Sequence, residues 1–249
     1  LLLFVLPIAG VLKLSLFDPG LTLKHYGQLF SVSVYVKVLA ITFQTAAIVT
    51  LLTLVLGYPV AYLMATVSSR LANLLLILVI IPFWISVLVR TYAWMVVLGR
   101  QGLLNTLLLN LGLIEVPLRL MHNFVGLLVG MTHVLLPFMI LPLFTVMKNI
   151  DRDLMKAAEN LGANRWRSFR RVFFPLSLPG VAGGCALVFV IGLGFFITPA
   201  LLGGPRDIMI SMLIERQVND LTNWGFGSAL AVMLLAATGL SLVAFKRFF

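Results

Sequence analysis

The chain has 249 residues, of which 61% are hydrophobic and only 10% are charged. A soluble domain of this size could not hide so much apolar surface from water, so the composition excludes a soluble protein and indicates one embedded in a membrane. The formal net charge of +10 would suggest nucleic acid in a soluble protein, but here no basic domain is present to bind it.

The apolar stretches predict an all-α membrane protein with six transmembrane helices, because most of them are long enough to cross a bilayer as helices. The predicted spans cover residues 1–17, 36–67, 73–99, 123–147, 173–202 and 226–245. The first stretch is short and begins with Leu rather than Met. We therefore interpret it as the outer part of a first helix whose N-terminal residues are missing, within one domain that covers residues 1–249.

Basic residues are distributed unevenly between the two sides of these spans. On one side lie Arg70, Lys148, Arg152, Lys156, Arg165, Arg167, Arg170, Arg171, Lys246 and Arg247. The basic residues on the other side are fewer and are diluted by acidic ones. Because Lys and Arg of short loops stay in the cytoplasm, we predict that the loop over residues 148–172 and both termini are cytoplasmic.

Arg90 is the one charged residue well inside a predicted span. A charge within the membrane is costly and by default indicates function. Arg90 also lies in the outer half of its helix, from where a long side chain can reach the interface, so both interpretations stay open. Together with Trp84, Tyr92 and Trp94 it forms our candidate substrate pathway, although aromatic residues are commonplace at membrane interfaces.

The segment from Arg100 to Asn123 has apolar residues at helical spacing, interrupted by Gly112 and Pro117. It predicts one or two short interfacial helices on the outer face.

The loop over residues 148–172 has the pattern of two short helices. Acidic side chains suit a helix N-terminus, and Asp151 and Asp153 precede apolar residues at helical spacing, which are Leu154, Ala157, Ala158 and Leu161. Gly162 follows, where a glycine can take the left-handed conformation that ends a helix.

Asn164 can cap a second helix, which places aromatic residues on one face and arginines on the other. The aromatic residues are Trp166, Phe169 and Phe173, and the arginines are Arg167, Arg170 and Arg171. Such a hairpin could lie on the membrane with its arginines at anionic lipid headgroups. The small face of the first helix suits close docking by another protein better, and we favour that interpretation.

No residue pattern in the chain indicates catalysis. Its histidines, His25, His122 and His133, are far apart, and Cys185 is the single cysteine, so we predict no metal site. No nucleotide-binding loop of the pattern G-x-x-x-x-G-K-[ST] occurs. We therefore predict no catalytic residues and no cofactor, and any energy from ATP must come through a partner.

The loop resembles the cytoplasmic loop of permease subunits of binding-protein-dependent ABC importers. That loop has the pattern EAA, three residues, Gly, nine residues, then Ile-x-Leu-Pro. The corresponding residues here are Lys156, Ala157, Ala158, Gly162, Val172, Phe174 and Pro175. Lys156 replaces the family's glutamate, and Glu159, one turn further on, is a candidate to compensate.

The resemblance extends over nearly the whole chain. The stretches LGYPVAYLMA, IPFWISVLVRTYAWM, VLLPFMILPLF and LLGGPRDIMI look like those of the spermidine/putrescine-type permease group. This implies the fold of a type I ABC importer permease in a bacterial cytoplasmic (inner) membrane, with a coupling helix in the loop over residues 148–172.

The resemblance also implies partners and roles. ATP and Mg are bound by two ATP-binding subunits, which receive the coupling helix, while a second, non-identical permease and an extracytoplasmic solute-binding protein complete the importer. No nucleic acid is implied. The residues that meet the ATP-binding subunits are then Lys156, Ala157, Ala158, Glu159, Leu161, Gly162, Ala163 and Pro175.

The resemblance implies a small polar, nitrogen-containing solute of the polyamine type. Polyamine permeases often carry an acidic residue where this chain has Ala200, so an opine, an amino-acid derivative or another small organic solute is an alternative. A secondary transporter and an intramembrane enzyme are the alternative functions. Against a secondary transporter, the spans of this chain lack the acidic residues that usually couple transport to ions.

Overall fold

The computed structural model describes residues 2–17 and 20–248, and the regular elements of these residues are all helical. The α-helices are α1 (Leu2–Leu16), α2 (Lys24–Ser31), α3 (Ser33–Thr66), α4 (Ser69–Ile80), α5 (Val87–Leu98), α6 (Leu103–Asn110), α7 (Phe124–Lys148), α8 (Asp153–Asn160), α9 (Arg165–Ser168), α10 (Phe174–Leu193), α11 (Ile197–Leu202), α12 (Ile210–Glu215) and α13 (Trp224–Phe248). A 3₁₀-helix, η1 (Ile81–Trp84), and two π-helical turns, η2 (Phe169–Phe173) and η3 (Arg216–Asp220), lie between them.

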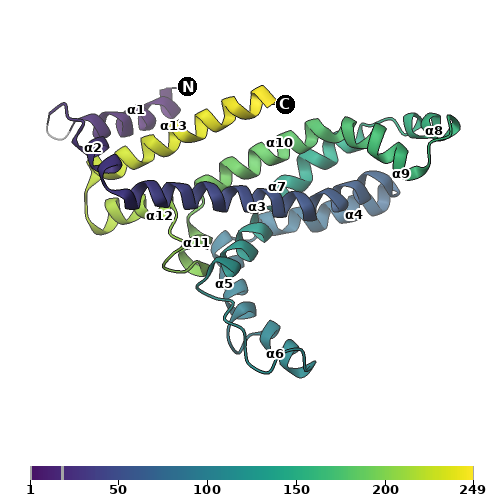
Figure 1. Cartoon of the computed structure of the whole chain (residues 1–249), viewed down its shortest axis with the longest axis horizontal. Helices are drawn as coiled ribbons and strands as arrows, with labels where there is room; N and C mark the ends of the chain where they lie inside the picture. The colour runs from purple at the N-terminus through teal and green to yellow at the C-terminus, as the bar shows by residue number, and fades with distance from the viewer. Residues whose placement is uncertain (1, 18–19, 249) are drawn as a thin grey trace.

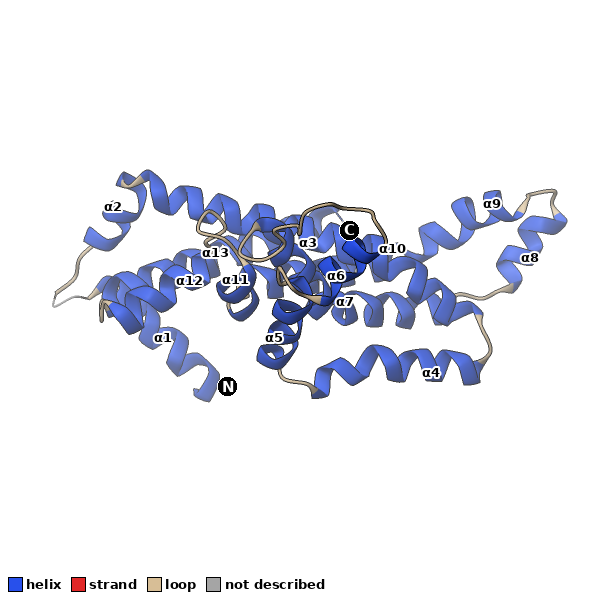
Figure 2. Cartoon of the chain, turned by 90° about the horizontal axis from the view of Figure 1, so that it is seen from below, coloured by secondary structure: helices blue, strands red, loops and turns tan. Residues whose placement is uncertain are grey.

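The longest helices run along the long axis of the molecule (Figure 1). The short helices α8 and α9 lie at one end of that axis, and α2 and α12 lie at the other. Figure 2 shows α8 and α9 at the same end in a view turned by 90°. Helices α5 and α6 leave the bundle sideways as an arm (Figure 1).

Four helical runs of the described chain are long and apolar enough to cross a membrane: α3, α7, the continuous run Arg165–Leu193, and Trp224–Phe245 of α13. A fifth span results if the bent pair Ser69–Trp84 and Val87–Asn110 counts as one. The stretch predicted as the first span contains only a shorter apolar helix. The all-helical membrane fold is confirmed, whereas the prediction of six spans is not.

The predicted span over residues 73–99 was wrong in its continuity. The chain bends by 99° between Ser69–Trp84 and Val87–Asn110. Pro82 is the second residue of the tight turn η1, where it has no backbone N–H to continue the α-helical hydrogen-bond ladder. Ile85 then takes an extended conformation. The bend sends α5 away from α4 and brings it against α11 and α7.

The predicted span over residues 173–202 was also wrong in its continuity. Helix α10 ends at Leu193, and a separate short helix, α11, starts at Ile197. Gly194 ends α10, and α11 then packs against α5 and α7. At its other end the helix extends further than predicted, because α9, η2 and α10 follow one another without a break from Arg165.

The outer segment over residues 100–123 forms one short helix, α6, as predicted. Gly112 follows it with φ +67°, and a buried side chain holds the rest of the segment. The side-chain amide of Asn105 donates to the carbonyl oxygens of Gly99 and Leu118, and its oxygen accepts from the Leu118 N–H.

Helices α3, α7 and α10 pack on one another and form the core. Lipid tails are as apolar as the core, so close packing rather than the hydrophobic effect holds such helices together. Glycines allow the close approach: a Cβ on Gly57 of α3 would lie 3.2 Å from side-chain atoms of Met139 and Ile140. A Cβ on Gly184 of α10 would lie 2.7 Å from the sulfur atom of Met139. Helix α7 is therefore held from both sides.

Candidate functional site

The first part of the site is helix α8, at the end of the bundle. The carboxylate of Asp151 accepts a hydrogen bond from the Asp153 N–H at 2.9 Å, which supports the helix at its start as predicted. Leu154, Ala157 and Leu161 are all exposed, and they lie at the spacing that places side chains on one face. Leu161 is 90% exposed. The described chain therefore leaves an apolar stripe uncovered on α8.

Gly162 ends this helix in the predicted left-handed conformation, with φ +87°. The Gly162 N–H donates to the carbonyl of Glu159 at 2.9 Å, and the Ala163 N–H donates to the carbonyl of Ala158 at 3.0 Å. This pair of bonds satisfies carbonyl groups that the end of a helix would leave free. The turn brings α9 back beside α8, where Ser168 Oγ donates to the Met155 carbonyl at 3.3 Å.

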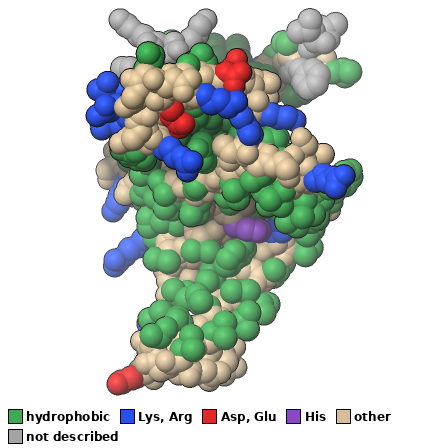
Figure 3. Space-filling model, turned by 90° about the vertical axis from the view of Figure 1, so that its right-hand side faces the viewer, with side chains coloured by type: hydrophobic (Ala, Val, Ile, Leu, Met, Phe, Trp, Pro, Cys, Tyr) green, Lys and Arg blue, Asp and Glu red, His purple; other side chains and the backbone are tan. Residues whose placement is uncertain are grey.

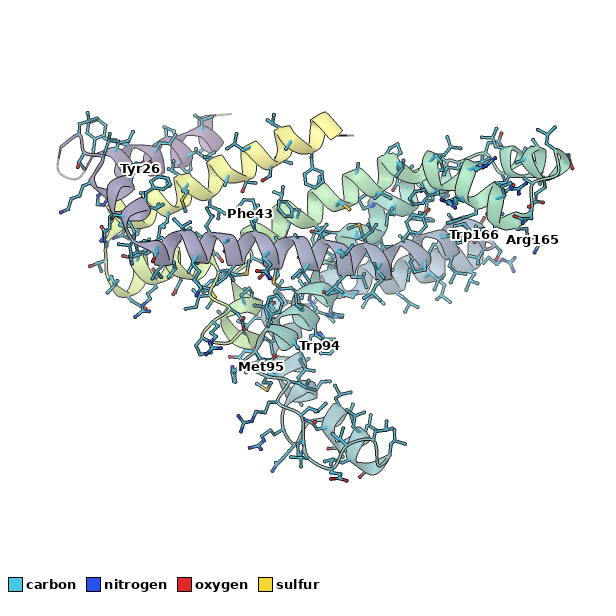
Figure 4. The ribbon with its side chains drawn as sticks, in the orientation of Figure 1. Tyr26, Phe43, Trp94, Met95, Arg165 and Trp166 are labelled. Atoms are coloured by element: carbon cyan, nitrogen blue, oxygen red, sulfur yellow. The ribbon has the colours of Figure 1, made fainter. Side chains whose placement is uncertain are left out.

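The second helix begins as predicted at Asn164, whose side-chain oxygen accepts from the Arg167 N–H at 2.8 Å. Its aromatic residues then form a stack, in which Phe169 lies between Trp166 and Phe173 with ring centroids 5.8 Å apart on each side. Tyr62 of α3 meets Phe169 and Phe173 edge-on at 5.4 Å and 5.0 Å. The two-helix loop is thereby packed against the end of α3, near Arg165 and Trp166 (Figure 4).

Two polar contacts join the same part of the molecule to the bundle. Arg152, just before α8, donates from Nη2 to the Ala65 carbonyl at 2.6 Å, in the last turn of α3. The hydroxyls of Tyr58 on α3 and Ser177 on α10 lie 2.9 Å apart. The first contact fixes the loop to α3, and the second joins α3 to α10 close to the loop.

The residues that the family pattern assigned to this loop lie together at the end of the bundle, with one exception. Lys156, Ala157, Glu159 and Leu161 are exposed on α8, whereas Pro175 lies near the start of α10, beyond the π-helical turn. Figure 3 shows Lys and Arg side chains gathered over this end, above a mostly hydrophobic surface.

Lys156 forms an ion pair within α8. Its Nζ donates to Asp153 Oδ1 at 2.8 Å, and both side chains are exposed. The hydrogen bond from Lys156 and its charge lower the pKa of Asp153, and the same bond and the Asp153 carboxylate raise the pKa of Lys156. Lys156 thus has an acidic partner within the loop, although water screens such a surface pair strongly. The compensation by Glu159 for the family's glutamate stays a prediction.

The contribution of this pair to stability is expected to be constant between about pH 6 and about pH 8. The contribution of Asp153 is lost only as the pH falls through its lowered pKa, and that of Lys156 only as the pH rises through its raised pKa. The difference in Tm between the wild type and Lys156→Gln should therefore not change across this range. A difference that shrinks as the pH rises would show that another group titrates beside Lys156.

The candidate pathway residues fall into two groups. The side chain of Trp84 is 88% exposed and that of Tyr92 is 50% exposed, so the described chain does not gather them around a common centre. Arg90 and Trp94 instead lie on the side of α5 that packs inward. The Arg90 residue is 8% exposed, and Figure 4 places Trp94 where the arm leaves the bundle.

His133 of α7 joins these two residues, which the sequence did not indicate. Its ring packs edge-on against Trp94, with centroids 5.5 Å apart and planes at 68°. Arg90 is near enough for its charge to act on His133. The spacing along the chain between residues 90–94 and 133 has no recognisable pattern, because the contact depends on the bend before α5.

The described residues contain no group of three or more His, Cys, Asp or Glu side chains that could hold a metal ion. The arrangement presents an exposed apolar stripe on α8 at one end and a buried cationic group on α5 within the bundle.

Comparison with known proteins gives consistent matches. The family model described as "Binding-protein-dependent transport system inner membrane component" matches residues 57–249. The spermidine/putrescine transport system permease protein PotB of Escherichia coli is 37% identical over 226 residues, which are 91% of this chain and 82% of that protein. PotB of Haemophilus influenzae is 36% identical over 91% of this chain and 79% of its own length. The inner membrane ABC transporter permease protein YdcU of Escherichia coli is 31% identical over 92% of this chain and 76% of its own length.

Among solved structures, a chain of a bacterial alginate ABC transporter, crystallised in complex with an alginate pentasaccharide-bound periplasmic protein, is similar in fold. The TM-score is 0.78 at 18% identity, over 98% of this chain and 87% of that one.

Proposed function

Because this chain belongs to the family of binding-protein-dependent transport system inner membrane components, we propose that it forms half of the membrane pathway of an ATP-driven importer. The chain is a permease subunit of an ABC importer, a non-catalytic transport component of the inner membrane. The resemblance to polyamine-type permeases is confirmed by relatives that match most of its length.

Helix α8 and the turn at Gly162 form the docking surface for the ATP-binding subunits. The observation that carries this proposal is the uncovered apolar stripe of Leu154, Ala157 and Leu161 at one end of the bundle. A lipid anchor would place such a stripe together with arginines at headgroups, but the nearby aromatic residues are turned instead toward Tyr62. The residues of the loop over 148–172 thus have separate outer and inner faces.

The α8–α9 end of the bundle lies in the cytoplasm. Support comes from the basic residues gathered there (Figure 3), since Lys and Arg of short loops are retained on the cytoplasmic side. Both termini then lie in the cytoplasm, and α1 belongs to the first of six spans. The bent pair α4–α5 is one span whose two halves pack mainly against different helices.

The importer contains two ATP-binding subunits, a second, non-identical permease and an extracytoplasmic binding protein. Two observations support this composition. The relatives are named as permease proteins of transport systems, and the alginate transporter was solved with a periplasmic protein. This chain has no nucleotide-binding loop of its own, so separate subunits bind ATP and Mg.

The solute is a small polycation of the polyamine class. Support comes from the PotB relatives, which are named for spermidine and putrescine. Opines and amino-acid derivatives are the competing solutes, because Ala200 stands where an acidic residue would attract a cation. Specificity resides largely in the binding protein.

Reconstitution of the complete importer in proteoliposomes tests the proposal. We expect uptake of labelled spermidine that requires ATP, the ATP-binding subunits and the binding protein, and no uptake by this chain alone. Calorimetry with the binding protein against spermidine, an opine and an amino acid then identifies the solute. Transport by the isolated chain driven by an ion gradient would indicate a secondary transporter.

A further inference from the structure

Arg90 is buried without a partner. The residue is 8% exposed, and its Nε atom is fully buried with no hydrogen-bond acceptor among the described residues. A guanidinium group has no neutral form at accessible pH, so Arg90 keeps its charge within a membrane protein. Such a charge is stable only if an acceptor or an opposite charge meets it.

A second unpartnered group lies beside it. The Nδ1 atom of His133 is also buried and has no hydrogen-bond partner, and Arg90 is near enough for its charge to act on His133. Trp94, one turn along α5 from Arg90, holds the imidazole ring edge-on. Arg90 on α5 and His133 on α7 therefore each hold a buried nitrogen without a hydrogen-bond partner, on two helices that pack together, and a carboxylate has two oxygens that can accept hydrogen bonds.

The described part of this chain offers no such carboxylate. Its acidic residues all lie outside the candidate spans, and they are Glu115, Asp151, Asp153, Glu159, Asp207, Glu215 and Asp220. Among the described residues, the acid that forms an ion pair is Asp153, whose partner is Lys156. That pair lies in the loop over residues 148–172, far from Arg90. The counter-charge for Arg90 must come from outside these residues.

The helix that carries Arg90 has a second face that the rest of the described chain does not cover. One flank of α5 carries exposed apolar side chains, among them Val89, Tyr92 and Val96. Helix α6 continues the arm away from the bundle (Figure 1) and packs against α5. Leu103, Leu107 and Leu111 on this arm are exposed as well. The arm is thus a surface that the rest of this chain does not cover.

We propose that Arg90 and His133 receive a carboxylate side chain from a membrane span of the second permease subunit. The inference rests on the proposed function, in which a second permease exists and the solute is a polycation. A polycation brings no negative charge, so it cannot neutralise Arg90. A lipid phosphate is the competing source of negative charge, and in that case Arg90→Glu would leave co-purification of the second permease unchanged and the inference would be wrong.

The experiment is a charge exchange in the complete importer. Arg90→Glu is expected to reduce co-purification of the second permease at least about tenfold, because a carboxylate would then face another carboxylate. The acidic residues in the spans of the second permease are then replaced by Arg, one at a time, in the presence of Arg90→Glu. One of these replacements should restore co-purification, and this rescue shows that Arg90→Glu still folds.

Two control variants separate pairing from other effects. Arg119→Glu, an exposed arginine in the segment after α6, should leave co-purification unchanged. Arg90→Gln, which removes the charge without adding one, should reduce co-purification less than Arg90→Glu does. If Arg90→Gln instead changes the KM for spermidine and leaves co-purification unchanged, Arg90 contacts the solute and the inference is wrong.

The remaining outcomes distinguish this inference from the proposed function. If no replacement in the second permease rescues Arg90→Glu while the wild-type importer takes up spermidine, the pairing is wrong and the function stands. If one replacement rescues assembly but the importer does not transport spermidine, the pairing stands and the solute is wrong.

Discussion

Gly162→Leu is expected to leave the permease in the membrane at the wild-type level while most of the ATP-binding subunits are lost. The φ of +87° at Gly162 costs a residue with a Cβ about 1–2 kcal/mol. No atom lies within 4 Å of the position that a Cβ would take, so the effect comes from backbone strain and from a bulky side chain beside the docking stripe. The six predicted spans do not include this loop, so their insertion should not depend on it.

Quantitative co-purification of the ATP-binding subunits measures this effect. Two further variants separate the backbone strain at Gly162 from the contribution of the arginine face. Gly162→Asn should retain more of these subunits than Gly162→Leu, because Asn tolerates the left-handed conformation better than other residues do. Arg170→Ala, at an exposed arginine of the π-helical turn, should be much milder. Equal retention by the wild type and Gly162→Leu would show that α8 is a lipid anchor.

Gly184→Val should have the opposite result: little folded permease in the membrane. A Cβ at Gly184 would lie 2.7 Å from the sulfur of Met139, 3.2 Å from its carbonyl oxygen and 3.6 Å from its Cα. The sulfur can move, but the backbone of α7 cannot move without separating from α3. Overpacking of this kind costs about 1–3 kcal/mol in a well-packed core, and the branched side chain adds to that cost.

Gly183→Val is the matched control on the next residue of α10. Gly183 is exposed, and the nearest atom to its Cβ position is a Pro142 carbon at 4.0 Å. The Tm of the purified protein and the amount of chain in the membrane should be near the wild-type values for Gly183→Val and well below them for Gly184→Val. If both variants behave alike, the close contact between α7 and α10 does not limit stability.

The structure of the loop over residues 148–172 could be predicted from the sequence because local chemistry determines it. Asp151, Asn164 and Gly162 each act within a few residues of their own position, as caps or as a helix end. The spans α3, α7 and α13 were predictable for a similar reason, since a long apolar run has few alternatives to a helix in a membrane. Their bounds agree with the predicted ranges to within a few residues.

The bends and the Arg90 site could not be predicted in the same way. Hydropathy measures how long an apolar run is, and it does not show where the run changes direction. The break before α5 follows a proline, but the break after Leu193 depends on where α11 packs against α5 and α7. The contact between Trp94 and His133 depends on the break before α5. Tertiary packing therefore decides which of the polar residues in the spans meet.

The unbroken run from Arg165 to Leu193 has a mechanical consequence. It contains 29 residues, and at a rise of 1.5 Å per residue it is about 43 Å long. If the run tilts as one body, a displacement of about 8 Å at its Arg165 end corresponds to a tilt of about 10°. The same tilt would reach Leu193 at the other end of the run, and the π-helical turn η2 and Pro179 are the two points where the run could bend instead.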